Sequence, residues 1–117
     1  MKKVYHLATC STCQRILKEI KAEGNGFELQ DIKTAKMTEV QLDEMRALSG
    51  SYEALFSRKA MKYRSMGLGD KELNEADYKS LILDEYTFLK RPVTLLNAKI
   101  FIGNAKSTTA AILEELS

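Results

Sequence analysis

The sequence predicts an α/β fold with a mixed four-stranded sheet and a helical insertion between its two halves. Three observations lead to this prediction. The first thirty or so residues read as strand, helix and strand, and the chain ends in two short strands followed by a helix. Roughly sixty residues separate these parts, and they carry only helical patterns, far beyond the length of an ordinary loop.

The N-terminal part begins with residues 2–7, KKVYHL, which fit a short strand. The apolar residues that follow recur at one-turn spacing: Ile16, Leu17 and Ile20. This spacing predicts a helix from about residues 10–12 to the glycines of residues 24–26, a usual C-terminal cap signal. Residues 27–32 alternate apolar and polar side chains, as a strand does. A helix between two strands implies a parallel crossover.

The middle of the chain is predicted to be helical. Three segments have helical patterns: 38–50, 57–69 and 74–89. Thr38 and Gln41 have the spacing of a capping box, and Asn74 is a suitable N-cap residue. We therefore expect three short helices, bounded by glycines and polar caps.

The C-terminal part follows Pro92, the only proline in the chain. Two apolar runs, 93–96 and 99–102, are separated by two residues, which predicts a hairpin. Residues 107–117 have the pattern of an amphipathic helix. Its expected inward residues are Ile112, Leu113 and Leu116.

This order of elements, βαβ followed by ββα, is the thioredoxin topology. We interpret the 117 residues as a single thioredoxin-like domain. Its core spans about residues 1–35 and 90–117, and the helical insertion spans about 36–89.

Composition argues against several classes of partner. The formal net charge is +2, from 18 basic and 16 acidic residues, which gives no argument for direct nucleic-acid binding. No apolar run approaches the length needed to cross a membrane, and no signal peptide is apparent. We expect a monomeric, cytoplasmic protein, in which the two cysteines do not form a structural disulfide.

Both cysteines of the chain, Cys10 and Cys13, lie at the start of the first helix. Unpaired backbone N–H groups there favour an anion, so a Cys10 thiolate would be stabilised. Cys13 follows one turn later and can act as the resolving thiol of a disulfide. Simple packing is the alternative, more so for Cys13 than for Cys10. A zinc site is a weaker alternative, because two cysteines and one histidine do not complete four ligands, so no metal is expected.

Two further side chains are expected near Cys10. His6, the only histidine, ends the first strand, where it could tune the thiol or donate a hydrogen bond to an anion. A histidine satisfied by backbone is the alternative. Arg91 precedes Pro92, and this X-Pro bond is a candidate cis bond in the loop that faces the first helix. A guanidinium there suits a tetrahedral oxyanion, and a surface arginine is the alternative.

Three motifs in this order resemble the arsenate reductase (ArsC) family, which includes the Spx-type transcriptional regulators. They are VYHLATCSTCQRI at 4–16, FSRKAMKYRSMGL at 56–68 and LKRPVTL at 89–95. The resemblance covers essentially the whole chain. It implies a thioredoxin fold with an inserted helical subdomain, in agreement with the pattern of elements.

The resemblance also implies roles for individual residues. Cys10 matches the nucleophile and His6 matches the histidine of the family. Arg58 and Arg91 match two arginines that hold the oxyanion, although composition alone would leave Arg58 on a solvated face. Thr12, between the two cysteines, is included in the expected oxyanion-binding set.

The third arginine of the family has no counterpart here, because Ile102 and Gly103 lie at about its position. Lys99 or Lys106 could replace its charge, but not its two-pronged geometry. No bound cofactor is implied.

The resemblance leads to two alternative functions. The first is a thiol-dependent oxidoreductase of the glutaredoxin-coupled arsenate reductase type. Cys10 would attack a small oxyanion or a disulfide, and glutathione with glutaredoxin, or thioredoxin, would supply electrons. The second is an Spx-type regulator that binds RNA polymerase and switches through a Cys10–Cys13 disulfide. The C-x-x-C spacing resembles this second branch.

Overall fold

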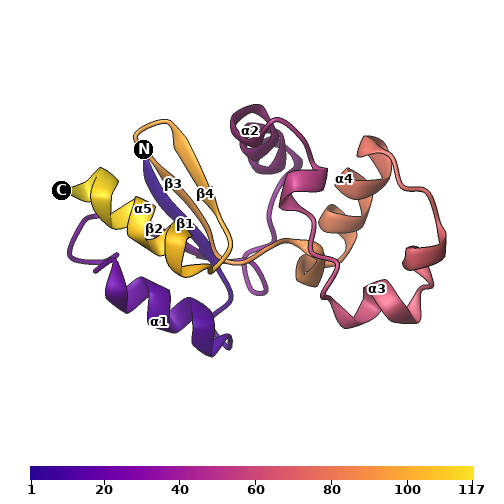
Figure 1. Cartoon of the computed structure of the whole chain (residues 1–117), viewed down its shortest axis with the longest axis horizontal. Helices are drawn as coiled ribbons and strands as arrows, with labels where there is room; N and C mark the ends of the chain where they lie inside the picture. Colours follow the sequence, from indigo (N-terminus) through magenta and orange to yellow (C-terminus); the bar gives the residue numbers. More distant parts are fainter. The chain divides into compact units, whose positions relative to one another are not determined.

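The computed structural model describes residues 1–117, which form two units, Met1–Lys36 with Arg91–Ser117 and Met37–Lys90. In the first unit the elements are β1 (Lys2–His6), α1 (Ser11–Glu19), β2 (Glu28–Asp31), β3 (Val93–Leu96), β4 (Lys99–Ile102) and α5 (Lys106–Leu116) (Figure 1). In the second unit they are α2 (Glu39–Ser49), η1 (Glu53–Leu55), α3 (Met61–Ser65), η2 (Leu68–Asp70), α4 (Glu75–Asp84) and η3 (Tyr86–Phe88), where η denotes a 3₁₀ turn.

The strands of the first unit form one mixed sheet in the order β2-β1-β3-β4. β1 runs parallel to β2, and β3 runs antiparallel to both β1 and β4. α1 makes the crossover that a parallel pair requires. This arrangement confirms the predicted mixed four-stranded sheet and its thioredoxin-like topology.

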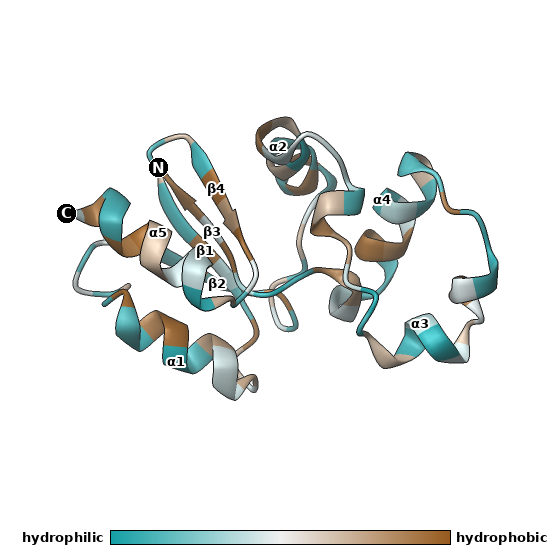
Figure 2. Ribbon diagram, viewed as in Figure 1, coloured by the Kyte–Doolittle hydropathy of each residue, from teal (hydrophilic) through white to brown (hydrophobic).

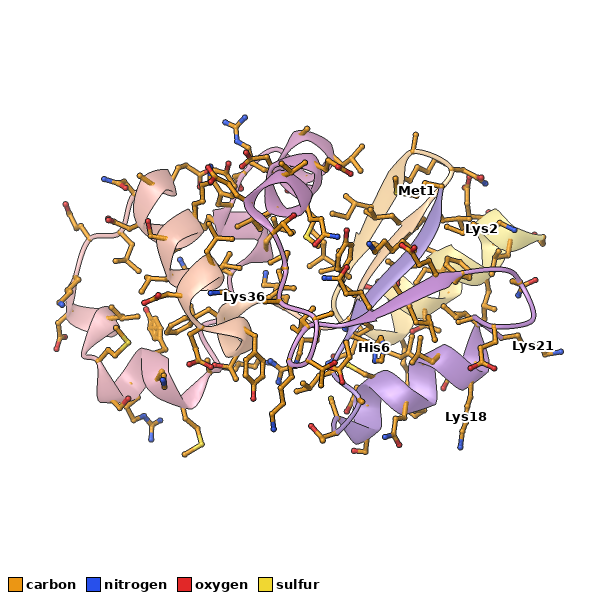
Figure 3. The ribbon with its side chains drawn as sticks, turned by 180° about the vertical axis from the view of Figure 1, so that it is seen from behind. Met1, Lys2, His6, Lys18, Lys21 and Lys36 are labelled. Carbon is orange, nitrogen blue, oxygen red and sulfur yellow. The ribbon has the colours of Figure 1, made fainter.

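The main core of the first unit lies between the sheet and two helices. α1 contributes Ile16 and its C-cap residue Ile20, α5 contributes Ile112, and the sheet contributes Val4 and Leu96, all at most 1% exposed. Burying each of these side chains is worth about 1.5–3 kcal/mol. The opposite side of α1 is polar, and Figure 3 shows Lys18 directed away from the sheet. The predicted amphipathic pattern of this helix is therefore confirmed.

The β3–β4 hairpin has the predicted strand bounds, and its turn consists of Asn97 and Ala98. Both turn residues have positive φ, 53° and 63°, as a two-residue hairpin turn requires. Asparagine tolerates this conformation, whereas alanine carries a steric cost of about 1–2 kcal/mol.

Replacing Ala98 by glycine is therefore expected to raise the free energy of unfolding by about 0.5–1 kcal/mol. Glycine removes the steric cost of positive φ but adds entropy to the unfolded chain, so the gain is smaller than the full cost. Urea denaturation followed by circular dichroism measures the change. Ala110→Gly, at an exposed position inside α5, is the matched control and should destabilise by about 1 kcal/mol. Equal destabilisation by both variants would contradict the turn assignment.

The second unit is built from short helices around an aromatic cluster. The ring of Phe56 lies 4.9 Å from Tyr78, 5.1 Å from Phe88 and 6.1 Å from Tyr63, centroid to centroid. Phe56 also pairs with Leu89 in an isolated antiparallel bridge. α2 and α4 begin with capping boxes, at Thr38 as predicted and at Asn74. Figure 2 shows that α3 is mostly hydrophilic.

The first helix is shorter than predicted. It ends at Glu19 instead of extending to the glycines at 24–26. The reason is a Schellman-type cap in which Lys21, with φ of 50°, takes the left-handed position that glycine usually occupies. The Ala22 N–H bonds the Leu17 carbonyl at 3.0 Å, and the Lys21 N–H bonds the Lys18 carbonyl at 3.1 Å.

Three other sequence predictions need correction. α3 covers only Met61–Ser65, because Gly67, the residue after the C-cap Met66, adopts the left-handed conformation. Arg58 therefore precedes this helix instead of opening it. α4 ends at Asp84, and the predicted remainder forms η3. Leu113, expected to point inward from α5, is 43% exposed.

No helix of the chain is long and apolar enough to span a membrane.

Candidate functional site around Cys10

The sheet register of the first unit brings two chain segments together beside Cys10. Tyr5 on β1 pairs with Val93 on β3, so the end of β1 lies next to the start of β3. The loop that leaves β1 leads to Cys10, and the segment that enters β3 contains Arg91 and Pro92. The peptide bond between Arg91 and Pro92 is cis. Topology alone therefore places the cysteine loop beside the arginine.

Cys10 is the N-cap residue of α1. Its backbone is extended, with φ of −89° and ψ of 114°, as N-cap residues usually are. The Cys10 N–H closes the preceding turn by bonding the Leu7 carbonyl at 3.0 Å, and its carbonyl accepts the Gln14 N–H at 3.1 Å. The Gln14 side chain also donates to the Ala8 carbonyl. The loop before the helix is thus held at both ends.

The environment of the Cys10 thiol favours the thiolate. Partial burial raises its pKa, but four other interactions together lower the pKa below its ordinary value of 9.0. They are hydrogen bonds from the Cys13 backbone N–H, the Cys13 thiol and the Thr12 backbone N–H, and the positive charge of Arg91. Backbone donors at a helix N-terminus are the usual means of stabilising a reactive thiolate.

Cys13 has the opposite character. Its side chain is 0% exposed, and burial raises its pKa. The Leu7 backbone N–H and the Arg91 charge lower the pKa, but donation to Cys10 and the negative charge of Cys10 raise it, to about 11 in all. Cys13 therefore remains a protonated thiol at neutral pH and donates its proton toward Cys10. Both cysteines are free thiols in the structure.

His6 is buried at the end of β1, 9% exposed, and its Nδ1 atom has no hydrogen-bond partner in the protein (Figure 3). The alternative of a histidine satisfied by backbone is therefore not met at this atom. Thr94 Oγ1 is likewise buried and without a partner. His6 is not among the main influences on the Cys10 pKa, which come from Cys13, Thr12 and Arg91.

Arg58 belongs to the second unit, where it has its own set of partners. Its Nη2 atom lies 2.8 Å from Glu53 Oε2 and 2.9 Å from the Tyr78 hydroxyl. The guanidinium carbon lies 5.7 Å from the centre of the Tyr78 ring. Arg58 also lines an open groove of about 950 Å³, together with Lys59, Ala60, Met61, Tyr63, Arg64, Ser65, Gly67, Gly69 and Asp70.

The structure argues against Lys99 as the replacement for a third arginine. Lys99 begins β4 and pairs with Leu96, at the opposite end of the hairpin from Val93 and Pro92. Three residues of strand, about 10 Å, separate the two ends. Lys99 is instead bound to Glu115 at 2.9 Å. Lys106 begins α5 and lines a small surface hollow with Arg15 and Glu19 of α1.

Sequence reasoning missed the partners of Arg58. Glu53 lies five residues before it and Tyr78 lies twenty residues after it, and no sequence spacing links either to an arginine. The fold of the second unit creates both contacts. The nearest sequence signal was Tyr78 itself, an aromatic residue in a predicted helix.

Comparison with known proteins agrees with the fold. The sequence model of the ArsC family matches residues 5–112. The chain belongs to the ArsC family. Among curated proteins, none matches the chain. The family assignment supports thiol-dependent oxidoreductase chemistry at the level of the family as a whole.

Solved structures of the same fold cover nearly the whole chain. An arsenate reductase from Vibrio cholerae has a TM-score of 0.77 at 18% identity, over 97% of both chains. A possible arsenate reductase from Streptococcus mutans has a TM-score of 0.73 at 25% identity, over 91% of this chain and 92% of that chain. An arsenate reductase (ArsC) related protein from Brucella melitensis has a TM-score of 0.70 at 19% identity. The match covers 94% of the present chain and 92% of the Brucella chain.

Proposed function

We propose that this ArsC-family protein is a thiol-dependent reductase in which the Cys10 thiolate attacks a small tetrahedral oxyanion of arsenate type. The observation that carries the proposal is the position of Cys10 at the N-cap of α1, where the backbone N–H groups of Thr12 and Cys13 help to lower the pKa of its thiol. Arg91 adds positive charge beside this sulfur. A thiolate and an oxyanion repel each other because both are negatively charged. The positive charge of Arg91 offsets this repulsion and so favours attack of the thiolate on the oxyanion.

The proposed reaction transfers two electrons from two thiols to arsenic. The Cys10 sulfur forms a bond to arsenic(V) and one oxygen leaves as water. A second thiolate then attacks the Cys10 sulfur, the sulfur–arsenic bond breaks, and its electron pair remains on arsenic as arsenite. The sum is arsenate plus two thiols giving arsenite, one disulfide and water.

Two thiols can serve as the second nucleophile. Glutathione would leave a mixed disulfide on Cys10 for glutaredoxin to reduce. Cys13 would leave a Cys10–Cys13 disulfide for glutaredoxin or thioredoxin to reduce. The negative charge of Cys10 is one cause of the raised Cys13 pKa, so this cause disappears when Cys10 is consumed. Cys13 thereby becomes a better nucleophile at the step that needs it.

The remaining roles belong to the proposal. Arg91 holds the oxyanion beside Cys10, and the Thr12 backbone N–H, one of the groups that lower the Cys10 pKa, is available to the attached group. The family resemblance assigns an oxyanion-binding role to Arg58 of the second unit as well. His6 donates a hydrogen bond to the anion or to the thiol. No group of three or more His, Cys, Asp or Glu side chains gathers in the structure in a way that could hold a metal ion.

The test is arsenate-dependent oxidation of NADPH, coupled through glutathione reductase, glutathione and glutaredoxin. We expect turnover by the wild-type protein and a loss of at least about 10³-fold in Cys10→Ser, because the nucleophile is removed. Ser11→Ala, at the exposed neighbouring position, is the control and should retain activity. Equal rates for wild type and Cys10→Ser would exclude the reaction.

The same thiolate could act on a disulfide instead of an oxyanion. Incubation with glutathione disulfide, followed by mass spectrometry of the intact and digested protein, should then reveal one glutathione on Cys10. In wild-type protein the adduct should decay to an internal disulfide, whereas in Cys13→Ala it should persist. A protein that stays unmodified would argue against this version.

A redox regulator of the Spx type is the second candidate, favoured by the hydrogen bond between the Cys13 thiol and Cys10. In this case the Cys10–Cys13 disulfide would itself be the signal, read by RNA polymerase. A pull-down of purified RNA polymerase with the reduced and the oxidised protein discriminates the two functions. Absence of association in both states would remove the regulator.

A further inference from the structure

The guanidinium of Arg58 is already occupied by groups of its own unit. Nη2 carries two hydrogens, and it has two acceptors, Glu53 Oε2 at 2.8 Å and the Tyr78 hydroxyl at 2.9 Å. The Arg58 pKa is raised above its ordinary value, chiefly by the Glu53 hydrogen bond. Both hydrogens of Nη2 are therefore in use.

Nη2 is the nitrogen on which two-pronged binding by an arginine depends. A guanidinium offers two edges with parallel donors, one formed by Nε and Nη2 and the other by Nη1 and Nη2. Both edges include Nη2. An oxyanion therefore cannot take two parallel hydrogen bonds from Arg58 unless Glu53 or Tyr78 leaves.

Tyr78 is the fixed partner of Arg58. Its side chain is buried, and its ring packs 4.9 Å from the ring of Phe56 in the aromatic cluster. The Arg58 guanidinium also lies over this ring, 5.7 Å from its centre. Removing Tyr78 from Nη2 would disturb both the cluster and this contact.

Glu53 is the partner that can leave. Its side chain is 55% exposed. The backbone of Glu53 is held separately, because its N–H donates a hydrogen bond to Glu75 Oε2 at 3.1 Å. The Glu53 carboxylate can thus rotate into solvent while its backbone stays in place. Exposed ion pairs are weak, so the displacement requires only a modest gain from the incoming anion.

We propose that Glu53 is a specificity-determining residue, an internal carboxylate that an oxyanion must displace before Arg58 can bind it through two hydrogen bonds. This inference rests on the proposed oxyanion-binding role of Arg58. A doubly charged tetrahedral oxyanion offers more charge and more acceptor oxygens than one carboxylate, so it can displace Glu53. A simple carboxylate such as acetate offers the same group as Glu53, which has the advantage of being tethered beside Arg58.

The test measures arsenate and acetate binding without turnover, in full-length protein carrying Cys10→Ser, by calorimetry and by NMR titration. We expect Glu53→Gln to bind arsenate roughly two- to five-fold more tightly, the range expected for loss of an exposed ion pair. Acetate should compete with arsenate more effectively in Glu53→Gln than in the parent. Adding Arg58→Ala should abolish both gains.

Glu85→Gln is the matched control. Glu85 pairs with Lys62 at 2.8 Å, the same distance as the Glu53–Arg58 pair, in the same unit. This variant changes the net charge equally and frees a different cation. Thermal melts of each variant establish that it folds, and Glu53→Ala provides a second substitution. With Cys10 restored, Glu53→Gln should lower the KM for arsenate and leave kcat unchanged.

The outcomes separate this inference from the proposed function. If Arg58→Ala weakens arsenate binding but Glu53→Gln behaves like Glu85→Gln, the role of Glu53 is wrong and the oxyanion role of Arg58 stands. If Arg58→Ala leaves arsenate binding unchanged, or if no variant binds arsenate, both assignments to Arg58 and Glu53 fail. Turnover does not enter the binding result, so a failure of the thiol chemistry is detected separately.

Discussion

Iodoacetamide is expected to modify Cys10 at pH 7 at least ten-fold faster than Cys13. With a pKa of about 11, only ~10⁻⁴ of Cys13 is thiolate at that pH, whereas the Cys10 pKa lies below 9.0. The more basic thiolate is intrinsically more nucleophilic, so the difference between the two rates is smaller than the difference between the two thiolate fractions. Complete burial of Cys13 increases the difference again.

Mass spectrometry of digested protein, sampled over time and over pH, measures both rates. The Cys10 rate should rise with pH and level off at a lower pH than for an unperturbed thiol, because its thiolate is stabilised. In Cys13→Ala this midpoint should move upward, since one hydrogen-bond donor to the Cys10 sulfur is lost. Equal labelling of the two cysteines, or a Cys10 midpoint at or above 9.0, would contradict the proposed thiolate site.

Phe56→Ala is expected to lower the free energy of unfolding by about 3–5 kcal/mol, the usual cost of deleting a buried phenylalanine. Phe56 is 0% exposed and contacts three aromatic rings of the second unit. Because Tyr78 is one of these rings, the substitution should also loosen the support of Arg58. The deletion therefore removes both packing and the positioning of a guanidinium.

Urea denaturation followed by far-ultraviolet circular dichroism measures this change, since the chain has no tryptophan for fluorescence. Met61→Ala is the control, because this side chain is 89% exposed and its loss should cost less than about 0.5 kcal/mol. A separate early transition in Phe56→Ala would indicate that the second unit unfolds on its own. A loss below 1 kcal/mol would show that the aromatic cluster is not a core.

The sequence was most informative where local chemistry determines the structure. The hairpin strands and their two-residue turn were predicted with correct bounds, because alternation and turn length fix a hairpin locally. The capping box at Thr38 was predicted for the same reason. Cys10 was placed at the start of α1 from the switch between strand and helix periods alone.

The sequence was least informative where tertiary contacts decide. α1 ends early because Lys21 adopts the left-handed conformation that glycine usually adopts. No residue pattern in the sequence predicts a positive φ at a lysine. Leu113 fitted an inward position by period but lies on the exposed side of α5. The contacts of Arg58 with Glu53 and Tyr78 depend on the fold of the whole second unit, so they could not be found from spacing.

The division of the sheet between the two ends of the chain has a consequence for biosynthesis. β1 is a central strand, but one of its two neighbours, β3, begins only at Val93. All of Met37–Lys90 is therefore synthesised before the sheet can be completed. We expect the later-encoded helical unit to gain its structure first during translation, while the thiol-bearing N-terminal segment waits, incompletely paired, for the last quarter of the polypeptide.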